Sequence, residues 1–176
     1  MIRLLTIVYN FFFCLKYPFM KAYNCYTGEF CGYEFTEYYF ISPGWRKAFG
    51  KQLLKDIKKA YKLDKKENPK LTWKEALCFE EIKSKYGTLR LYAMATPRIM
   101  EVLEKYEDLS MYYCEHCGKP SKYATRCWVE YLCEDCFGQA LLRCDLNFKS
   151  LDEYNQYLDK YKISEKSCWH FLNKGL

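Results

Sequence analysis

The chain has 176 residues, of which 50% are hydrophobic and 19% aromatic, and its formal net charge is +6. This composition excludes a disordered chain, because burying so much apolar surface offsets the conformational entropy that folding costs. The length suits one domain with a sizeable core, with or without a small metal-stabilised appendage. A pI near 8.6 permits contact with nucleic acid or another acidic surface but is lower than a dedicated nucleic-acid-binding domain normally shows.

Cysteine usage and the N-terminal segment bear on the cellular compartment. The eleven cysteines are an odd number, which does not favour a framework of disulfides. The apolar segment from Leu4 to Leu15 is short for a membrane span, and bulky residues follow it where a signal peptidase requires small ones. We therefore expect a core helix rather than a signal peptide or anchor, no membrane partner, and a cytoplasmic location, where paired cysteines more often bind metal.

Two elements are predicted before residue 43. Residues 2–16 have a helical pattern that Pro18 ends, and their apolar stripe indicates a buried core helix. The stripe consists of Leu4, Val8, Phe11 and Leu15, with Leu5 and Phe12 beside it. Residues 20–42 are rich in aromatic side chains and contain Gly28 and Gly32, a composition that favours short strands.

An amphipathic helix is predicted over about residues 45–62, directly after a Pro-Gly turn. Its apolar stripe repeats at four-residue steps and consists of Trp45, Phe49, Leu53, Ile57 and Tyr61. The opposite face is basic and carries Lys47, Lys51, Lys55, Lys58, Lys59 and Lys62. A solvated lysine face, as most surface helices have, and an electrostatic footprint for phosphate groups are both open. The polar residues 64–70 are expected to form an exposed loop.

Three further helices and a hairpin are expected in the rest of the chain. Residues 72–75 fit a capping box that opens a short helix. Residues 79–92 contain two segments that can pair as a hairpin around Gly87. A Thr-Pro pair begins a helix over residues 96–109, and a second capping pattern predicts a final helix over about residues 150–161.

The strongest chemical signal is a pair of Cys-x-x-Cys knuckles separated by fifteen residues and formed by Cys114, Cys117, Cys133 and Cys136. Four thiolates suit a tetrahedral Zn²⁺ ion, and each knuckle brings two of them to the ion from one tight turn. Gly118 allows the positive φ with which the backbone turns back toward the sulfur atoms. Lys119 and Lys122 would stabilise the negative charge of the thiolates. The spacing therefore predicts a zinc-ribbon-like module with structural zinc.

Other chemistry is open to the same four cysteines, which also suit buried thiols, disulfides or an iron–sulfur cluster. Zinc is favoured because paired knuckles with a flanking glycine are the usual closed zinc arrangement. Cys168 and His170 have no partner pair that would complete a second site. A closed four-cysteine site has no open coordination position, so it contributes to folding and argues against a metalloenzyme.

Sequence signatures of catalysis are largely missing. The two histidines, His116 and His170, do not form the His-x-Glu motif of zinc deaminases or the His-Glu-x-x-His motif of metalloproteases. The sequence also lacks a glycine-rich phosphate loop and the Gly-x-Ser-x-Gly nucleophile motif. Carboxylates such as Glu80 and Glu81 leave metal-dependent catalysis open, but we expect a non-enzymatic protein.

Several spaced motifs resemble those of uncharacterised small proteins from bacteriophages and prophages. They are a Gly-Trp pair that opens a helix, the Lys-x-Lys-Tyr-Gly-x-Leu-Arg-x-Tyr segment at residues 83–92, Ser110, and the cysteine ribbon. The resemblance covers about residues 43–136 and implies a shared fold, a phage-like origin and hence the host-cell cytoplasm. It singles out Lys83, Lys85 and Arg90, which suit either hairpin packing and surface charge or a binding role.

These features together predict an α+β protein with aromatic-rich short strands, about four helices and the zinc-ribbon-like module. We expect an α+β core in residues 1–110, the ribbon in 111–140 and a C-terminal helical segment, 141–176, that packs on the core. The leading function is a nucleic-acid-associated or regulatory factor that uses the lysine face and Arg90. The alternative is a protein-interaction module, such as a phage-encoded inhibitor of a host or defence protein, with aromatic contacts.

Overall fold

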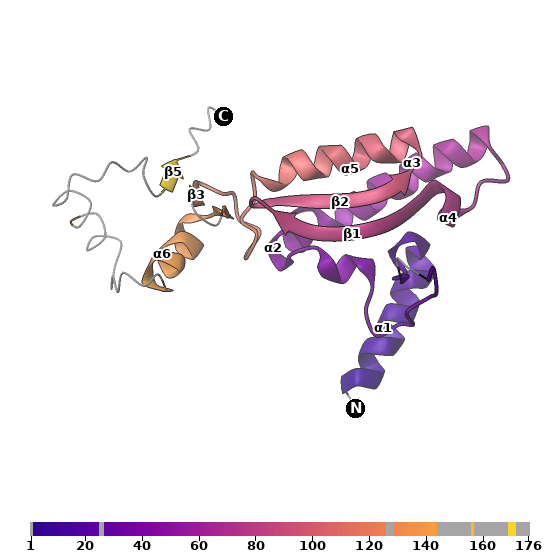
Figure 1. Ribbon diagram of the computed structural model, residues 1–176, viewed down its shortest axis with the longest axis horizontal. Coiled ribbons are helices and arrows are strands. Elements are labelled where there is room, and N and C mark those ends of the chain that lie inside the picture. Colours follow the sequence, from indigo (N-terminus) through magenta and orange to yellow (C-terminus); the bar gives the residue numbers. More distant parts are fainter. Residues whose placement is uncertain (1, 25–26, 126–128, 144–155, 157–168, 172–176) are drawn as a thin grey trace.

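The computed structural model describes residues 2–24, 27–125, 129–143, 156 and 169–171. The fold is α+β, as the sequence predicts. At its centre is an antiparallel hairpin of β1 (Leu77–Lys85) and β2 (Thr88–Ala95). Figure 1 shows α3 (Lys51–Glu67) and α5 (Pro97–Ser110) running along this hairpin. The main core lies between these helices and the hairpin.

The hairpin turn confirms the role predicted for Gly87. Tyr86 and Gly87 have φ values of 53° and 72°, the conformation of a two-residue turn that matches the twist of paired strands. Lys85 therefore pairs with Thr88, and the register continues with a bulge between Phe79 and Glu81. The alternation along the strands places Ile82, Leu89 and Leu91 in the core.

The predicted amphipathic helix is confirmed and extends beyond both predicted ends. It consists of α2 (Pro43–Trp45), a π-helical turn η3 (Arg46–Gly50) and α3. Its stripe is buried at Trp45, Phe49, Leu53 and Ile57, with Tyr61 half-buried. At the π-helical turn the Tyr38 hydroxyl donates to the Arg46 carbonyl at 3.4 Å, where a Cβ on residue 50 would overlap that hydroxyl. Glycine at position 50 therefore lets the Tyr38 ring lie against the helix.

The loop predicted for residues 64–70 is wrong in its first half, because α3 continues to Glu67. Asp64 accepts hydrogen bonds from the Thr96 hydroxyl at 2.6 Å and from the Arg98 guanidinium. Arg98 also pairs with Glu67 at 2.8 Å. These bonds to the start of α5 hold the last turn of α3 in helical form, which no local pattern indicates.

The helix-start signals at residues 72–75 and 96–97 are confirmed. Thr72 and Glu75 form a complete capping box at the start of α4 (Trp73–Ala76). Helix α5 begins at Pro97, and its stripe buries Ile99, Leu103 and Tyr106. The Tyr106 hydroxyl donates to Asp56 of α3 at 2.7 Å, which fixes the two helices against each other.

The strands predicted for residues 20–42 are wrong. The described residues of this stretch form the 3₁₀ turns η1 (Pro18–Met20) and η2 (Glu37–Phe40), and isolated bridges join Lys21 to Thr36 and Tyr23 to Phe30. The aromatic side chains contact one another and neighbouring elements instead of forming a sheet face. The aromatic composition of this segment therefore reflects packing of side chains against one another. It does not reflect the alternating pattern of a β-strand.

The N-terminal helix is confirmed as α1 (Ile2–Lys16), but its predicted burial is wrong. The predicted stripe and its neighbours are exposed: Leu4, Leu5, Val8, Phe11, Phe12 and Leu15. The opposite side packs inward, where the Asn10 amide donates to the carbonyls of Tyr33 and Glu34 at 2.9 and 3.2 Å, and Cys14 is buried. Within the described residues, no helix has the length and apolar composition that a membrane crossing requires.

The C-terminal module contains a small sheet in the strand order β4-β3-β5. Its strands are β3 (Tyr123–Thr125), β4 (Tyr131–Leu132) and β5 (Trp169–Phe171), and α6 (Glu134–Arg143) follows β4. The predicted helix over residues 150–161 lies almost wholly outside the described residues, as does most of the segment 141–176. Its described strand, β5, pairs antiparallel with β3.

Glu37 at the start of η2 is a half-buried carboxyl group with an unusual environment. It lines a cavity of about 380 Å³ together with Glu80, Glu81 and the ring of Phe35. Burial raises the pKa of Glu37 from 4.5 to about 7, although the backbone N–H of Tyr23 favours the charged form. Ionisation of this side chain therefore opposes folding.

We expect Glu37→Gln to change how stability depends on pH. The folded protein holds the Glu37 proton to higher pH than the unfolded chain, so this group lowers the free energy of unfolding as the pH rises from 4.5 to about 7. Relative to the unmodified protein, the variant should gain stability as the pH rises from 4.5 to about 7 and keep that gain at higher pH, in urea unfolding followed by circular dichroism. Glu80→Gln, in the same cavity but exposed, is the control; a pH-independent difference for Glu37→Gln would contradict this role.

Candidate metal centre

The structure brings the four predicted cysteines together from two separate segments. Cys114 and Cys117 lie in the loop after α5, Cys133 directly follows β4, and Cys136 lies in the first turn of α6. Their four Sγ atoms all lie within 4.8 Å of one another, and Cys117 and Cys133 are 3.4 Å apart. All four thiols are free of disulfide bonds. The cluster therefore presents four sulfur ligands around one point.

Local hydrogen bonds shape each knuckle. The Cys114 N–H donates to the Lys119 carbonyl at 2.8 Å, and the Gly118 N–H donates to the Cys114 carbonyl at 2.9 Å. Gly118 has a φ of +79°, as the sequence predicts for this turn. In the second knuckle the Phe137 N–H donates to the Cys133 carbonyl at 2.9 Å, which begins α6.

A very small apolar core surrounds the cysteines. Leu132 and Phe137 are buried with Cys114 and Cys133, and the Tyr123 ring stacks on Phe137 with 4.2 Å between centroids. Among the residues that the structure describes, these few apolar side chains bury little surface, and small modules are normally stabilised by a metal or disulfides.

The cluster fits a tetrahedral metal ion. A metal–sulfur distance of about 2.3 Å places four tetrahedral sulfur atoms about 3.8 Å apart. The four sulfur atoms lie within 4.8 Å of one another, with Cys117 and Cys133 at 3.4 Å, which is close enough for all four to reach one ion. Burial and the three neighbouring thiols raise the pKa of the Cys136 thiol well above its usual range. A bound cation would supply the positive charge that allows four thiolates to lie together. The four cysteines can therefore hold a metal ion.

Two lysines connect the knuckles at the surface. Lys119 pairs with Asp135 at 2.5 Å, and Lys122 pairs with Glu134 at 2.7 Å. Both pairs are exposed, so they add little stability. His116 lies outside the cluster, with its Nε2 atom 3.6 Å from Glu130.

The first knuckle lies directly against the start of α2. The Gly44 N–H donates to the Glu115 carbonyl at 2.8 Å, and a Cβ on residue 44 would overlap the carbonyl oxygen of Cys114. A Cβ on Gly118 would in turn lie 2.5 Å from the Gly44 carbonyl oxygen. Next to this contact, the buried Trp45 indole donates to the carbonyls of Ser110 and Tyr113 at 3.1 and 3.2 Å.

Glu115 joins the knuckle to the core in a way that the sequence did not indicate. Its carboxylate accepts hydrogen bonds from the Ser42 hydroxyl at 2.7 Å and from the Ser84 hydroxyl at 3.0 Å. Ser42 precedes α2 and Ser84 lies on β1, so one side chain ties the knuckle to both elements. Only the position of Glu115 between the metal ligands could have suggested its importance.

The hairpin of β1 and β2 also contacts the region where the first knuckle lies against the start of α2. The Leu89 N–H donates to the buried Ser110 hydroxyl oxygen at 2.9 Å, and a Cβ on Gly87 would lie 2.9 Å from the carbonyl of Val129 and the ring of Tyr131. The spaced motifs around Gly44, Gly87, Ser110 and the first knuckle therefore converge at one place. Their residue types are explained by close backbone approach and hydrogen bonding.

The other predicted binding residues lie apart from the cysteines. Lys47, Lys51, Lys55, Lys59 and Lys62 are exposed, and none forms an ion pair with a residue that the structure describes. Lys58 differs, since its ammonium donates to the Lys16 carbonyl at 3.2 Å. Arg90 pairs with Glu107 at 3.4 Å and is 36% exposed, so part of its charge is used within the fold.

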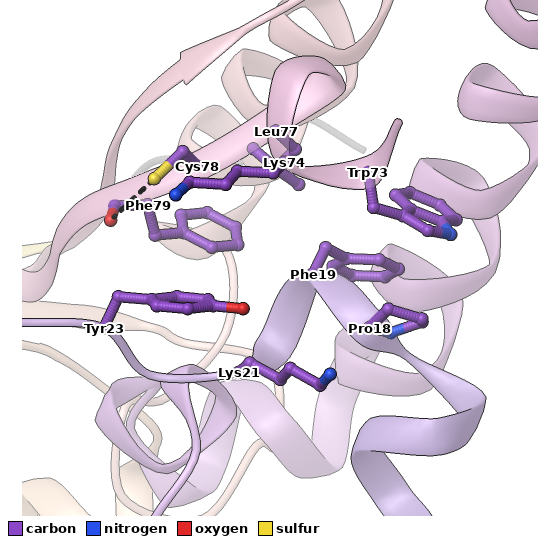
Figure 2. Close-up of a pocket in the computed structure, with 9 residues that line it drawn as sticks. All are labelled: Pro18, Phe19, Lys21, Tyr23, Trp73, Lys74, Leu77, Cys78 and Phe79. Atoms are coloured by element: carbon purple, nitrogen blue, oxygen red, sulfur yellow. Dashed lines mark hydrogen bonds between the residues drawn. The ribbon is translucent and has the colours of Figure 1, made fainter. Parts of the chain in front are cut away.

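A second cavity lies between η1, α4 and β1 (Figure 2). It has a volume of about 210 Å³, and its walls include the rings of Phe19, Tyr23, Trp73 and Phe79. Lys21 and Lys74 stand at its edge, with the Lys74 ammonium 5.8 Å from the centre of the Tyr23 ring. The described residues that line it include no carboxylate or histidine.

Comparison of the chain with known proteins identifies no relative. No protein-family model, no curated protein and no solved structure matches the chain. The likeness to phage proteins therefore stays a prediction from the sequence motifs, and the site has to be interpreted from its own chemistry.

We expect Gly44→Ala to weaken both the core and the metal centre. The added methyl group would overlap the Cys114 carbonyl, which belongs to backbone held by the knuckle, so the free energy of unfolding should fall by about 2 kcal/mol or more. Urea unfolding and the metal content after dialysis against a mild chelator would measure the two effects.

Gly138→Ala is the matched control for that substitution. Gly138 lies within α6 with open space where its Cβ would be, so alanine should raise stability by about 0.5–1 kcal/mol. Equal effects of the two substitutions would contradict the close approach at Gly44.

Removing one sulfur ligand should release the metal. We expect purified protein to contain about one metal ion per chain by mass spectrometry, and Cys133→Ser to lose both the ion and cooperative thermal unfolding of the module. Cys31→Ser, at an exposed thiol outside the cluster, should retain both. A metal-free protein with unchanged unfolding would refute the metal centre.

Proposed function

We propose that the four cysteines bind one structural zinc ion, and that the protein is a non-enzymatic nucleic-acid-associated or regulatory factor that acts through the lysine face of α2–α3. Zinc is supported by the all-sulfur ligand set and by the closeness of its four sulfur atoms. With four protein ligands the ion has no open position for substrate, which supports a structural role.

The observation that supports the nucleic-acid proposal is that most lysines of this face have no ion-pair partner among the described residues. Five exposed ammonium groups on one helical face have no ion-paired carboxylate among the described residues, whereas Lys83, Lys105, Lys119 and Lys122 all have one. Charge that is not neutralised within the protein is available to phosphate groups, and each phosphate contact releases bound counterions. The buried stripe of α3 and its bond to Tyr106 make this face rigid.

A protein-interaction module is the second candidate. It is supported by exposed aromatic side chains at the end of the segment before α2, where Phe35, Tyr39 and Phe40 are 37%, 68% and 47% exposed and contact one another edge to face. Aromatic side chains dominate the binding energy of many protein interfaces. With the motif likeness to phage proteins, this surface suits an inhibitor of a host or defence protein.

The salt dependence of binding to nonspecific DNA and RNA separates the two candidates. We expect affinity to fall steeply with salt, and Lys51→Gln, Lys55→Gln and Lys62→Gln together to reduce the slope of log affinity against log salt by about 2 to 3 for duplex DNA. Lys58 is left unchanged because it contacts α1. Fluorescence anisotropy over a salt series would measure the slope.

Lys83→Gln, Lys105→Gln and Lys122→Gln together are the control, because they remove the same charge from lysines that are ion-paired. This variant should keep most of the slope. Absence of binding at low salt would refute the nucleic-acid proposal, and recovery of one stoichiometric host protein that Tyr39→Ala releases would support the alternative.

A further inference from the structure

Helix α1 exposes an apolar face that none of the residues described by the structure covers. Figure 1 shows the helix projecting from the rest of the structure, with its N-terminal end far from the hairpin. Leu4, Leu5, Val8, Phe11, Phe12 and Leu15 are each at least 39% exposed, and Phe12 is 63% exposed. Isolated exposed apolar residues are common, but a contiguous face of this kind marks an interaction surface.

The face is broad, and its charge lies at its C-terminal end. At 100° per residue, these six side chains and Tyr9 span about 160° of the helix circumference, and the only charged residue of α1 within that sector is Lys16, the last residue of the helix. On the remaining circumference Asn10, Phe13 and Cys14 face the protein, whereas Arg3 and Thr6 near the N-terminus are exposed. Near the N-terminus Arg3 is paired with Glu34. The helix is therefore anchored on one side, and its exposure on the other is not a result of loose packing.

Positive charge gathers where the apolar face ends. The ammonium groups of Lys16 and Lys58 lie 5.4 and 5.5 Å from the centre of the Tyr17 ring, and Lys58 also donates to the Lys16 carbonyl. A tyrosine flanked by lysines after an apolar helix is the arrangement that lies at the boundary between hydrocarbon and phospholipid head groups.

We propose that α1 is an interfacial helix that binds the surface of an anionic phospholipid bilayer. Its apolar face would lie among the upper acyl chains, and Lys16 and Lys58 would contact the negatively charged head groups. The sequence led us to expect no membrane partner, because the segment is short for a membrane span and was expected to be buried; its length still excludes a span, but the structure exposes it. A helix that lies flat in the interface needs no membrane-spanning length.

The size and shape of the face favour a bilayer over a second copy of the chain or a groove in another protein. A stable dimer buries about 800 Å² per partner with 20 to 30 residues, more than seven side chains of one helix supply. A helix in a protein groove uses a narrow row of anchors at three- and four-residue steps. The flanking lysines complement anionic lipid and would oppose pairing of two positively charged copies.

Vesicle co-sedimentation of the full chain tests the proposal. We expect binding to vesicles of phosphatidylcholine with phosphatidylserine, and at least about tenfold weaker partitioning for Phe12→Glu, which places a charge in the apolar face. Lys16→Gln should weaken binding to these vesicles about fivefold and leave binding to pure phosphatidylcholine unchanged. Met94→Glu is the matched control, because Met94 is equally exposed, at 64%, on β2.

Metal content and circular dichroism would show that each variant is folded, and Leu5→Glu replaces Phe12→Glu if that variant is not. Failure of the unmodified protein to bind anionic vesicles, or equal loss with Met94→Glu, would overturn the proposal. So would a concentration-dependent dimer that Phe12→Glu dissociates in the absence of vesicle binding. The variants on α1 leave Lys51, Lys55 and Lys62 in place, so this proposal and the nucleic-acid proposal can fail separately.

Discussion

The fold depends on a backbone contact between Gly44 and the first cysteine knuckle. The Gly44 N–H donates to the Glu115 carbonyl, and a Cβ on residue 44 would overlap the carbonyl oxygens of Cys114 and Glu115. A Cβ on residue 118 would lie 2.5 Å from the Gly44 carbonyl oxygen, so glycine is needed at both positions for the knuckle to lie against the start of α2. Trp45, one residue later, then places its indole under the carbonyls that lead into the knuckle. Binding of a metal ion by the four cysteines would therefore be linked to folding of the core through the same few backbone groups.

This linkage explains why particular residue types are needed at positions that lie far apart in the sequence. Ser110 accepts a hydrogen bond from the hairpin and its carbonyl accepts one from Trp45, so it serves the sheet and the helix at once. Glu115 lies between two metal ligands, yet its carboxylate bonds to Ser42 and Ser84 of the core. A metal ion held by the cysteines would restrain both knuckles, and that restraint would extend through these bonds to the hairpin and α2. Metal binding would thus stabilise the main core as well as the C-terminal module.

The features that the sequence predicted correctly are those that depend on residues close together in the chain. The cysteine spacing, the turn at Gly87, the capping box at Thr72 and the stripe of α3 each depend on neighbours a few residues away, and each is confirmed. The last turn of α3 and the role of Glu115 depend on partners more than 30 residues away. The orientation of α1 was predicted wrongly because its sequence is apolar almost all round, so periodicity could not select a face. The Asn10 amide selected it, since its inward position satisfies two backbone carbonyls.

The exposed face of α1 is maintained by the chain itself. The helix cannot turn this face inward without removing Asn10 from the Tyr33 and Glu34 carbonyls, which would leave those polar groups unsatisfied in a partly buried place. Nor can the face pack on the outer side of α3, because lysine ammonium groups there would lose water without gaining carboxylate partners. Exposed apolar surface of this kind lowers the stability of the protein in water. This cost is offset only when another apolar surface covers the face. Specific hydrogen bonds thus hold an unfavourable apolar surface in place, and the lysines around Tyr17 would place positive charge beside whatever covers it.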